Sequence, residues 1–102
     1  LRPVYLSLGS VDPNGRSFLV YGFSPSARPL GPESILCVGG AVRVVPLPAP
    51  SMNPPSTFTQ FGFDPVPAGV AAGATVHFQG WQRIPGTPAG RTSNALAITF
   101  AP

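Results

Sequence analysis

The stretch TVHFQGWQR at residues 75–83 decides the fold class, because apolar and polar side chains alternate along much of it. Successive side chains of an extended strand point to opposite sides of a sheet. Val76, Phe78 and Gly80 therefore share one side. The other side carries Thr75, His77, Gln79, Trp81 and Arg83. The pattern predicts a β-strand with one apolar face and one more polar, exposed face.

Short segments rich in β-branched and aromatic residues recur along the rest of the chain. Lysine is absent, and a proline or a glycine interrupts every window longer than 11 residues, which argues against helices. The predicted strands lie at residues 3–9, 16–24, 35–38, 41–46, 56–63, 75–83 and 94–100. Seven or eight short strands about a dozen residues apart are typical of an all-β, antiparallel β-sandwich of jelly-roll or immunoglobulin-like type.

The segments between these strands carry turn and crossover signals. Asp12-Pro13-Asn14-Gly15 predicts a tight turn and a hairpin between segments 3–9 and 16–24. Gly39-Gly40 predicts a tight hairpin or, as we favour, a bend that carries one strand across a corner. Three prolines at 25–34 predict an irregular loop, and residues 66–74 and 84–91 are interpreted as loops. Five prolines at 46–55 predict an extended crossover between sheets or a binding strap.

The length and the net charge of the chain limit the number of domains and the kinds of partner that we expect. Its 102 residues predict a single domain, residues 1–102, with one modest core. Six arginines stand against three carboxylates, at a net charge of +3, and they occur singly, so no nucleic-acid binding is expected. No apolar stretch reaches the roughly 20 residues of a membrane span. Because the chain starts at Leu1 without a signal-type segment, we expect a removed signal peptide or an excised domain.

The small number of reactive side chains predicts a protein without enzymatic activity. The chain has one histidine and one cysteine, and no Gly-x-Ser-x-Gly elbow is present. The turn at residues 12–15 lacks the later ligands of a calcium loop, and Gly39-Gly40 lacks the partners of a phosphate loop. Cys37 has no cysteine to pair with in the chain and is expected to be a small buried apolar residue. We predict no catalytic residue, no cofactor and no metal site.

Trp81 is the residue with the most specific alternative interpretation. On an exposed sheet face it would offer an apolar plane beside the hydrogen-bonding groups of His77, Gln79 and Arg83. Such a plane suits stacking on a sugar ring. A lone tryptophan in a small sandwich is more often part of the core, so glycan binding is the alternative and not the leading hypothesis.

Four segments carry a resemblance to a known group of domains: residues 18–22 (FLVYG), residues 36–40 (LCVGG) followed by Arg43, residues 78–83 (FQGWQR), and residues 93–96 (SNAL) leading to Thr99-Phe100. In order and spacing they resemble the small C-terminal β-sandwich domains of secreted and cell-surface proteins from high-GC bacteria such as planctomycetes and myxobacteria. The resemblance spans almost the whole chain and implies an extracellular β-sandwich, with no functional residues to transfer. Relatives often carry an aromatic residue and an Asp where this chain has Gln82 and Ile84, and some have a second Cys near Gly80 that could bridge to Cys37.

These observations favour a secreted or cell-surface structural protein that self-assembles into a homo-oligomer or polymer, such as a bacterial surface fibre, filament or layer. Low charge and many apolar residues suit permanent contacts. Edge strands can pair between subunits. The alternative is a carbohydrate-binding module or an accessory domain of a secreted enzyme, with glycans as ligands. The candidate assembly or ligand contacts are Tyr5, Leu6, Leu8, His77, Gln79, Trp81 and Arg83.

Overall fold

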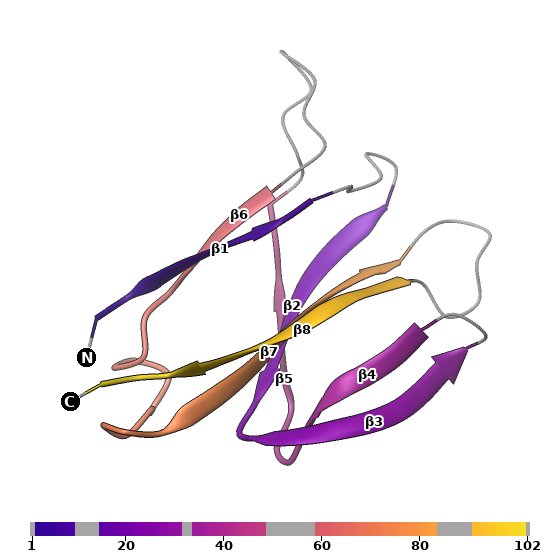
Figure 1. The fold of residues 1–102 in the computed structure, drawn as a ribbon. Helices are drawn as coiled ribbons and strands as arrows, with labels where there is room; N and C mark the ends of the chain where they lie inside the picture. Colours follow the sequence, from indigo (N-terminus) through magenta and orange to yellow (C-terminus); the bar gives the residue numbers. More distant parts are fainter. Residues whose placement is uncertain (1, 10–14, 32–33, 49–58, 84–90, 102) are drawn as a thin grey trace.

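The computed structural model describes residues 2–9, 15–31, 34–48, 59–83 and 91–101, and within these ranges the chain forms eight strands and no helix (Figure 1). The first four strands are β1 (Val4–Leu8), β2 (Arg16–Gly22), β3 (Ser24–Gly31) and β4 (Ser34–Gly39). The other four are β5 (Arg43–Pro46), β6 (Thr59–Phe63), β7 (Thr75–Arg83) and β8 (Arg91–Thr99). The predicted all-β class and the predicted number of strands are confirmed.

The strands form an antiparallel sandwich arranged around one four-stranded sheet. This sheet has the order β5-β2-β7-β8, and two-stranded sheets β1-β6 and β3-β4 lie on its two sides (Figure 1). All of the pairings are antiparallel. The sequence left the choice between a jelly-roll and an immunoglobulin-like order open, and the structure divides the strands among these three sheets.

Strands β2 and β7 occupy the centre of the four-stranded sheet and supply most of its buried residues. Their register pairs Leu19 with Gly80 and Tyr21 with Phe78. These residues and Val76 face the β1-β6 sheet, because side chains at every second position of a strand share a face. The main core cluster lies on this side, and its buried members are Leu19, Tyr21, Phe63, Val70, Val76, Phe78 and Phe100.

Aromatic rings hold β1-β6 against the four-stranded sheet. The ring of Phe63 meets those of Tyr21 and Phe78 edge-on, with centroid distances of 5.0 and 4.9 Å. Edge-to-face contacts of this kind add about 0.5–1.5 kcal/mol each beyond the burial of their area. Phe63 is only 4% exposed, so it joins the two layers at the centre of the core.

The side chain of Gln79 fixes the β3-β4 sheet on the opposite face. Its amide oxygen accepts a hydrogen bond from the Cys37 N–H, and its amide nitrogen donates to the carbonyl oxygens of Ile35 and Ser93, each at 2.8 Å. Gln79 is 2% exposed, and these bonds satisfy a polar group that would otherwise be costly to bury. Strand β4 is thereby tied to β7 and β8 at once.

Two predictions about connections were wrong, and both errors have a physical cause. Strand β1 pairs with β6, not with β2, because Val4 and Leu6 pack into the core across the sandwich. The expected irregular loop at 25–34 contains β3, an edge strand with register shifts between Pro25 and Arg28 and between Pro29 and Gly31. Edge strands tolerate proline because one side of the strand needs no N–H donor.

Other predicted connections are confirmed or fall outside the described residues. The bend at Gly39-Gly40 is confirmed, because the chain passes there from β4 in one sheet to β5 in another. Gly40 has φ +78°, a conformation that glycine adopts without strain. Residues 66–74 form turns, as expected. The turn residues 12–14, most of the proline-rich segment 46–55 and the loop residues 84–90 lie outside the described ranges.

Candidate assembly surface

The edge strands of the sheets differ in how well they are protected against pairing with another chain. Charged residues, prolines and bulges at an edge discourage such pairing. Strand β5, at one edge of the four-stranded sheet, carries Arg43 and Pro46. Strand β3 carries Pro25, Arg28 and Pro29, together with two register shifts. These two edges are therefore protected.

Strand β8, at the other edge of the four-stranded sheet, lacks this protection over most of its length. Residues 92–99 contain neither a charged residue nor a proline. Ala95, Leu96, Ala97 and Thr99 are exposed, and Leu96 shows 48% of its surface. A long, uncharged, exposed edge is a template for another strand.

The hydrogen-bond pattern identifies which peptide groups of β8 face away from the sheet. Phe100 donates its N–H to the Ala74 carbonyl and accepts from the Gly73 N–H, so both its backbone groups turn toward the β7 side. Peptide groups alternate in direction along a strand. Those of Leu96 and Ile98 therefore also point to β7. The N–H and C=O groups of Ala95, Ala97 and Thr99 point outward from the edge.

A bulge in β8 sets the limit of this regular edge. Gln79 pairs with Ala95 and Trp81 with Thr92, so two residues of β8, Ser93 and Asn94, stand opposite Gly80 alone. The Gly80 N–H donates to the Ser93 hydroxyl at 2.8 Å instead of to the backbone. Bulges bend a strand and interrupt its pairing. The straight part of the edge is thus Ala95–Thr99.

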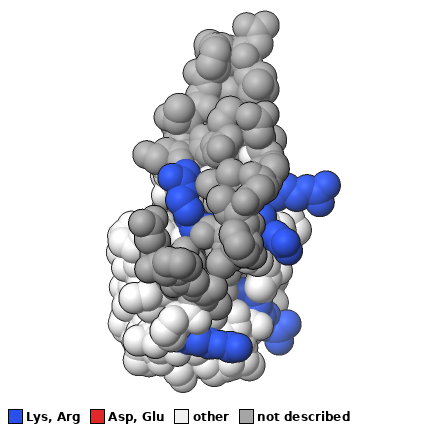
Figure 2. All heavy atoms as spheres, turned by 90° about the vertical axis from the view of Figure 1, so that its right-hand side faces the viewer, with Lys and Arg blue, Asp and Glu red and all other residues white. Residues whose placement is uncertain are grey.

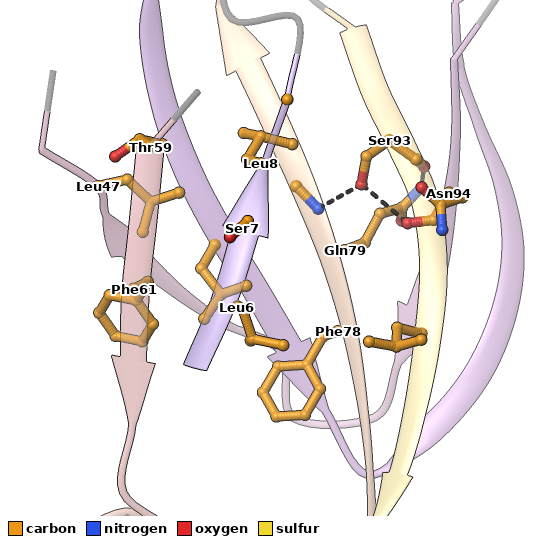
Figure 3. Close-up of a pocket in the computed structure, with 14 residues that line it drawn as sticks. Leu6, Ser7, Leu8, Leu47, Thr59, Phe61, Phe78, Gln79, Ser93 and Asn94 are labelled. Atoms are coloured by element: carbon orange, nitrogen blue, oxygen red, sulfur yellow. Dashed lines mark hydrogen bonds between the residues drawn. The ribbon is translucent and has the colours of Figure 1, made fainter. Parts of the chain in front are cut away.

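A groove of about 330 Å³ runs between β1 and β8 (Figure 3). Its lining includes Leu6, Phe61, Phe78 and Leu96 and contains no charged residue. A second hollow of about 300 Å³ shares Leu8, Gly9, Gly80, Ser93 and Asn94 with the first and adds Arg91. The groove is therefore apolar at one end and polar and cationic at the other, with the edge of β8 as one wall.

Gly80 shapes the groove because it leaves room for a β1 side chain. A Cβ atom at this position would lie 2.5 Å from Leu8 Cδ1 and 3.2 Å from Ser93 Oγ. We expect Gly80→Ala to lower the free energy of unfolding by about 1–2 kcal/mol, because the end of Leu8 must move out of the groove. Gly62→Ala is the control, since the nearest atom there belongs to the exposed ring of Tyr5, at 3.2 Å. Equal losses in urea denaturation of the two variants would contradict this interpretation.

The structure divides the sequence-predicted contact residues between two surfaces. Tyr5 is 84% exposed on the outer side of β1, while Leu6 and Leu8 are half-buried and line the groove. Trp81 and His77 are half-buried on the other face of the four-stranded sheet, and Arg83 on that face is exposed. The predicted contacts therefore do not form one site.

The expected exposure of Gln79 was wrong. The alternation correctly placed it on the face shared with Trp81 and His77, but β4 covers it there and its amide bonds to backbone groups. Trp81 packs against Phe18, with ring centroids 5.4 Å apart and planes tilted by 34°. Gln79 thus supports the fold and is not part of an open platform.

The sequence analysis did not identify one pair of neighbouring arginines. Arg16 and Arg83 are scattered in sequence but stand opposite one another in the register of β2 and β7. Both are exposed, and the next pair on the same face is Phe18 with Trp81. Figure 2 shows arginine side chains spread over one face of the molecule, with no carboxylate visible among the described atoms of that face. Only the strand register, which the sequence did not provide, could have revealed this pair.

No group of three metal-ligating side chains occurs among the described residues, and no helix found in those same ranges could span a membrane. A scan of protein-family models and searches of curated proteins and of solved structures found no match for this chain. The resemblance to bacterial cell-surface domains therefore stays a prediction.

Proposed function

We propose that this chain is an extracellular structural subunit or domain that self-assembles into a bacterial surface fibre, filament or layer. The observation that carries the proposal is the β8 edge, with outward peptide groups and no charge or proline from residue 92 to 99. Within the four-stranded sheet, the opposite edge strand β5 carries Arg43 and Pro46, which discourage pairing, whereas residues 92–99 of β8 carry no such residue. The apolar end of the groove beside β8, lined by Leu6, Phe61, Phe78 and Leu96, adds surface suited to permanent contacts.

The proposal predicts concentration-dependent association of the purified full chain. Sedimentation velocity over a hundredfold concentration range should reveal species larger than the 10.5 kDa monomer. Electron microscopy of concentrated material should then show ordered oligomers or polymers. A protein that sediments as a monomer throughout, with no ordered particles, would contradict the proposed function.

The arrangement of Arg16, Arg83, Phe18 and Trp81 supports carbohydrate binding as a second candidate function. Two arginines beside a half-buried aromatic pair combine a stacking surface with groups that bind carboxylates or sulfates. The ligand class would then be an acidic glycan. Isothermal titration with an acidic oligosaccharide should show saturable binding that Arg83→Gln weakens at least about tenfold. Equal binding by wild type and Arg83→Gln, or no binding, would remove this candidate.

A further inference from the structure

We propose that the partner of the β8 edge is the β8 edge of a second copy of this chain, paired antiparallel about a twofold axis through Ala97. This inference rests on the proposed self-assembly and names the surface and the register of one of its contacts, which by itself closes into a dimer. The two four-stranded sheets would join into one continuous sheet across the axis. A twofold interface uses the same patch on both subunits, so the edge must be complementary to itself.

The backbone of the edge meets this condition. A twofold axis at Ala97 places Ala95 opposite Thr99 of the second copy and Ala97 opposite its own equivalent. These are the residues whose N–H and C=O groups point outward. Every outward peptide group of Ala95–Thr99 therefore finds a donor or acceptor on the second copy. A shift by one residue would place inward-turned groups opposite outward ones.

The side chains of the edge are also self-complementary. In the same register Leu96 lies opposite Ile98 of the second copy, in a pair without mutual hydrogen bonds, where side chains approach most closely. Leu96 is 48% exposed in the single chain, and this contact would cover it. Ala95, Ala97 and Thr99 occupy the other face, and their small size allows the two sheets to meet without steric conflict.

The distribution of charge favours a second copy at this edge. Each chain carries a net charge of +3, so two copies repel unless they meet where charge is absent. Residues 92–99 provide such a place. Arg91 lies beyond the bulge, and the antiparallel register puts the two Arg91 residues at opposite ends of the interface, about 40 Å apart. The β5 edge would bring Arg43 into any equivalent contact.

Substitution by proline at Ala97 tests the register without removing a bond of the sheet. The N–H of Ala97 points outward, so Ala97→Pro deletes a donor that only the second copy would use. We expect Ala97→Pro to raise the dissociation constant of the dimer at least about 100-fold, because both central hydrogen bonds are lost. Ala97→Ser keeps the N–H and should assemble like the wild type. Sedimentation measures both, with circular dichroism as the check of folding.

Disulfide trapping tests the same interface in a chain that keeps its peptide groups. In a Cys37→Ser background, Ala97→Cys would face its own equivalent at a Cα distance of about 5.5 Å, within the range that a disulfide can bridge. Mild oxidation should convert this variant to a covalent dimer. Val66→Cys in the same background is the control, since Val66 is 64% exposed and lies in the turn segment 66–74, outside the proposed β8 interface. It should cross-link far more slowly.

The outcomes separate this inference from the proposed function. If the wild type associates but Ala97→Pro associates equally and Ala97→Cys cross-links no faster than Val66→Cys, another edge, such as β1, forms the interface. The β8 inference would then be overturned while self-assembly remains. If the wild type is monomeric at every concentration, both are overturned. Should Ala97→Pro fail to fold, the rate of cross-linking alone decides.

Discussion

Replacing Gly22 by alanine is expected to lower the free energy of unfolding by about 3 kcal/mol or more, because there is no space for a side chain at this position. A Cβ atom at Gly22 would collide with the backbone carbonyl oxygen of Gly39 and come within 3.0 Å of Val38 Cγ1. Val38 is 1% exposed, so neither group can move aside without opening the contact between β2 and β4. Guanidinium denaturation followed by circular dichroism measures the loss.

Gly9→Ala is the matched control for this prediction. Gly9 is exposed, and no atom lies within 4 Å of the place where its Cβ would be. The same chemical change should therefore alter stability by less than about 0.5 kcal/mol. If Gly22→Ala were as stable as Gly9→Ala, the close approach of β4 to β2 would be incorrect.

Replacing Gln79 by leucine is expected to lower the free energy of unfolding by about 3 kcal/mol. Leucine has a similar size, so the change leaves little cavity, but the Cys37 N–H and the carbonyl oxygens of Ile35 and Ser93 lose their common partner. Each lost hydrogen bond in a buried setting costs about 1 kcal/mol, and unsatisfied groups add to this loss. Chemical denaturation measures the total.

A second measurement on Gln79→Leu identifies which part of the fold is destabilised. Since Gln79 ties β4 to the four-stranded sheet, hydrogen exchange at the Cys37 amide and modification of the Cys37 thiol should both accelerate. Gln60→Leu is the control, because Gln60 is exposed on β6. Unchanged exchange at Cys37 in the Gln79 variant would show that β4 is held by other contacts.

Local sequence patterns predicted seven of the eight strands, but not which strands pair. The alternation at 75–83 matched β7, and the glycine pair at 39–40 correctly marked a change of sheet. The hairpin between β1 and β2 failed, because the turn signal is local whereas pairing is decided by which distant apolar faces can be buried together. The prolines at 25–34 predicted a loop where β3 lies, because a proline pattern does not show whether a segment lies at a sheet edge.

The same limit explains what the sequence could predict about the candidate site. Most of β8 was predicted as a strand, yet its place at an edge depends on strand order, which periodicity does not encode. Alternation assigned Gln79 to a polar face but could not show that a second sheet covers that face. The pairing of Arg16 with Arg83 likewise depends on register alone.

The most direct test of self-assembly through β8 is amide hydrogen exchange along Ala95–Thr99 at low and high protein concentration. The amides of Leu96 and Ile98 point to β7 and should be protected at both concentrations. The amides of Ala95, Ala97 and Thr99 should exchange freely when dilute and become protected when concentrated. An Ala97 amide that still exchanges freely at high concentration would contradict the account.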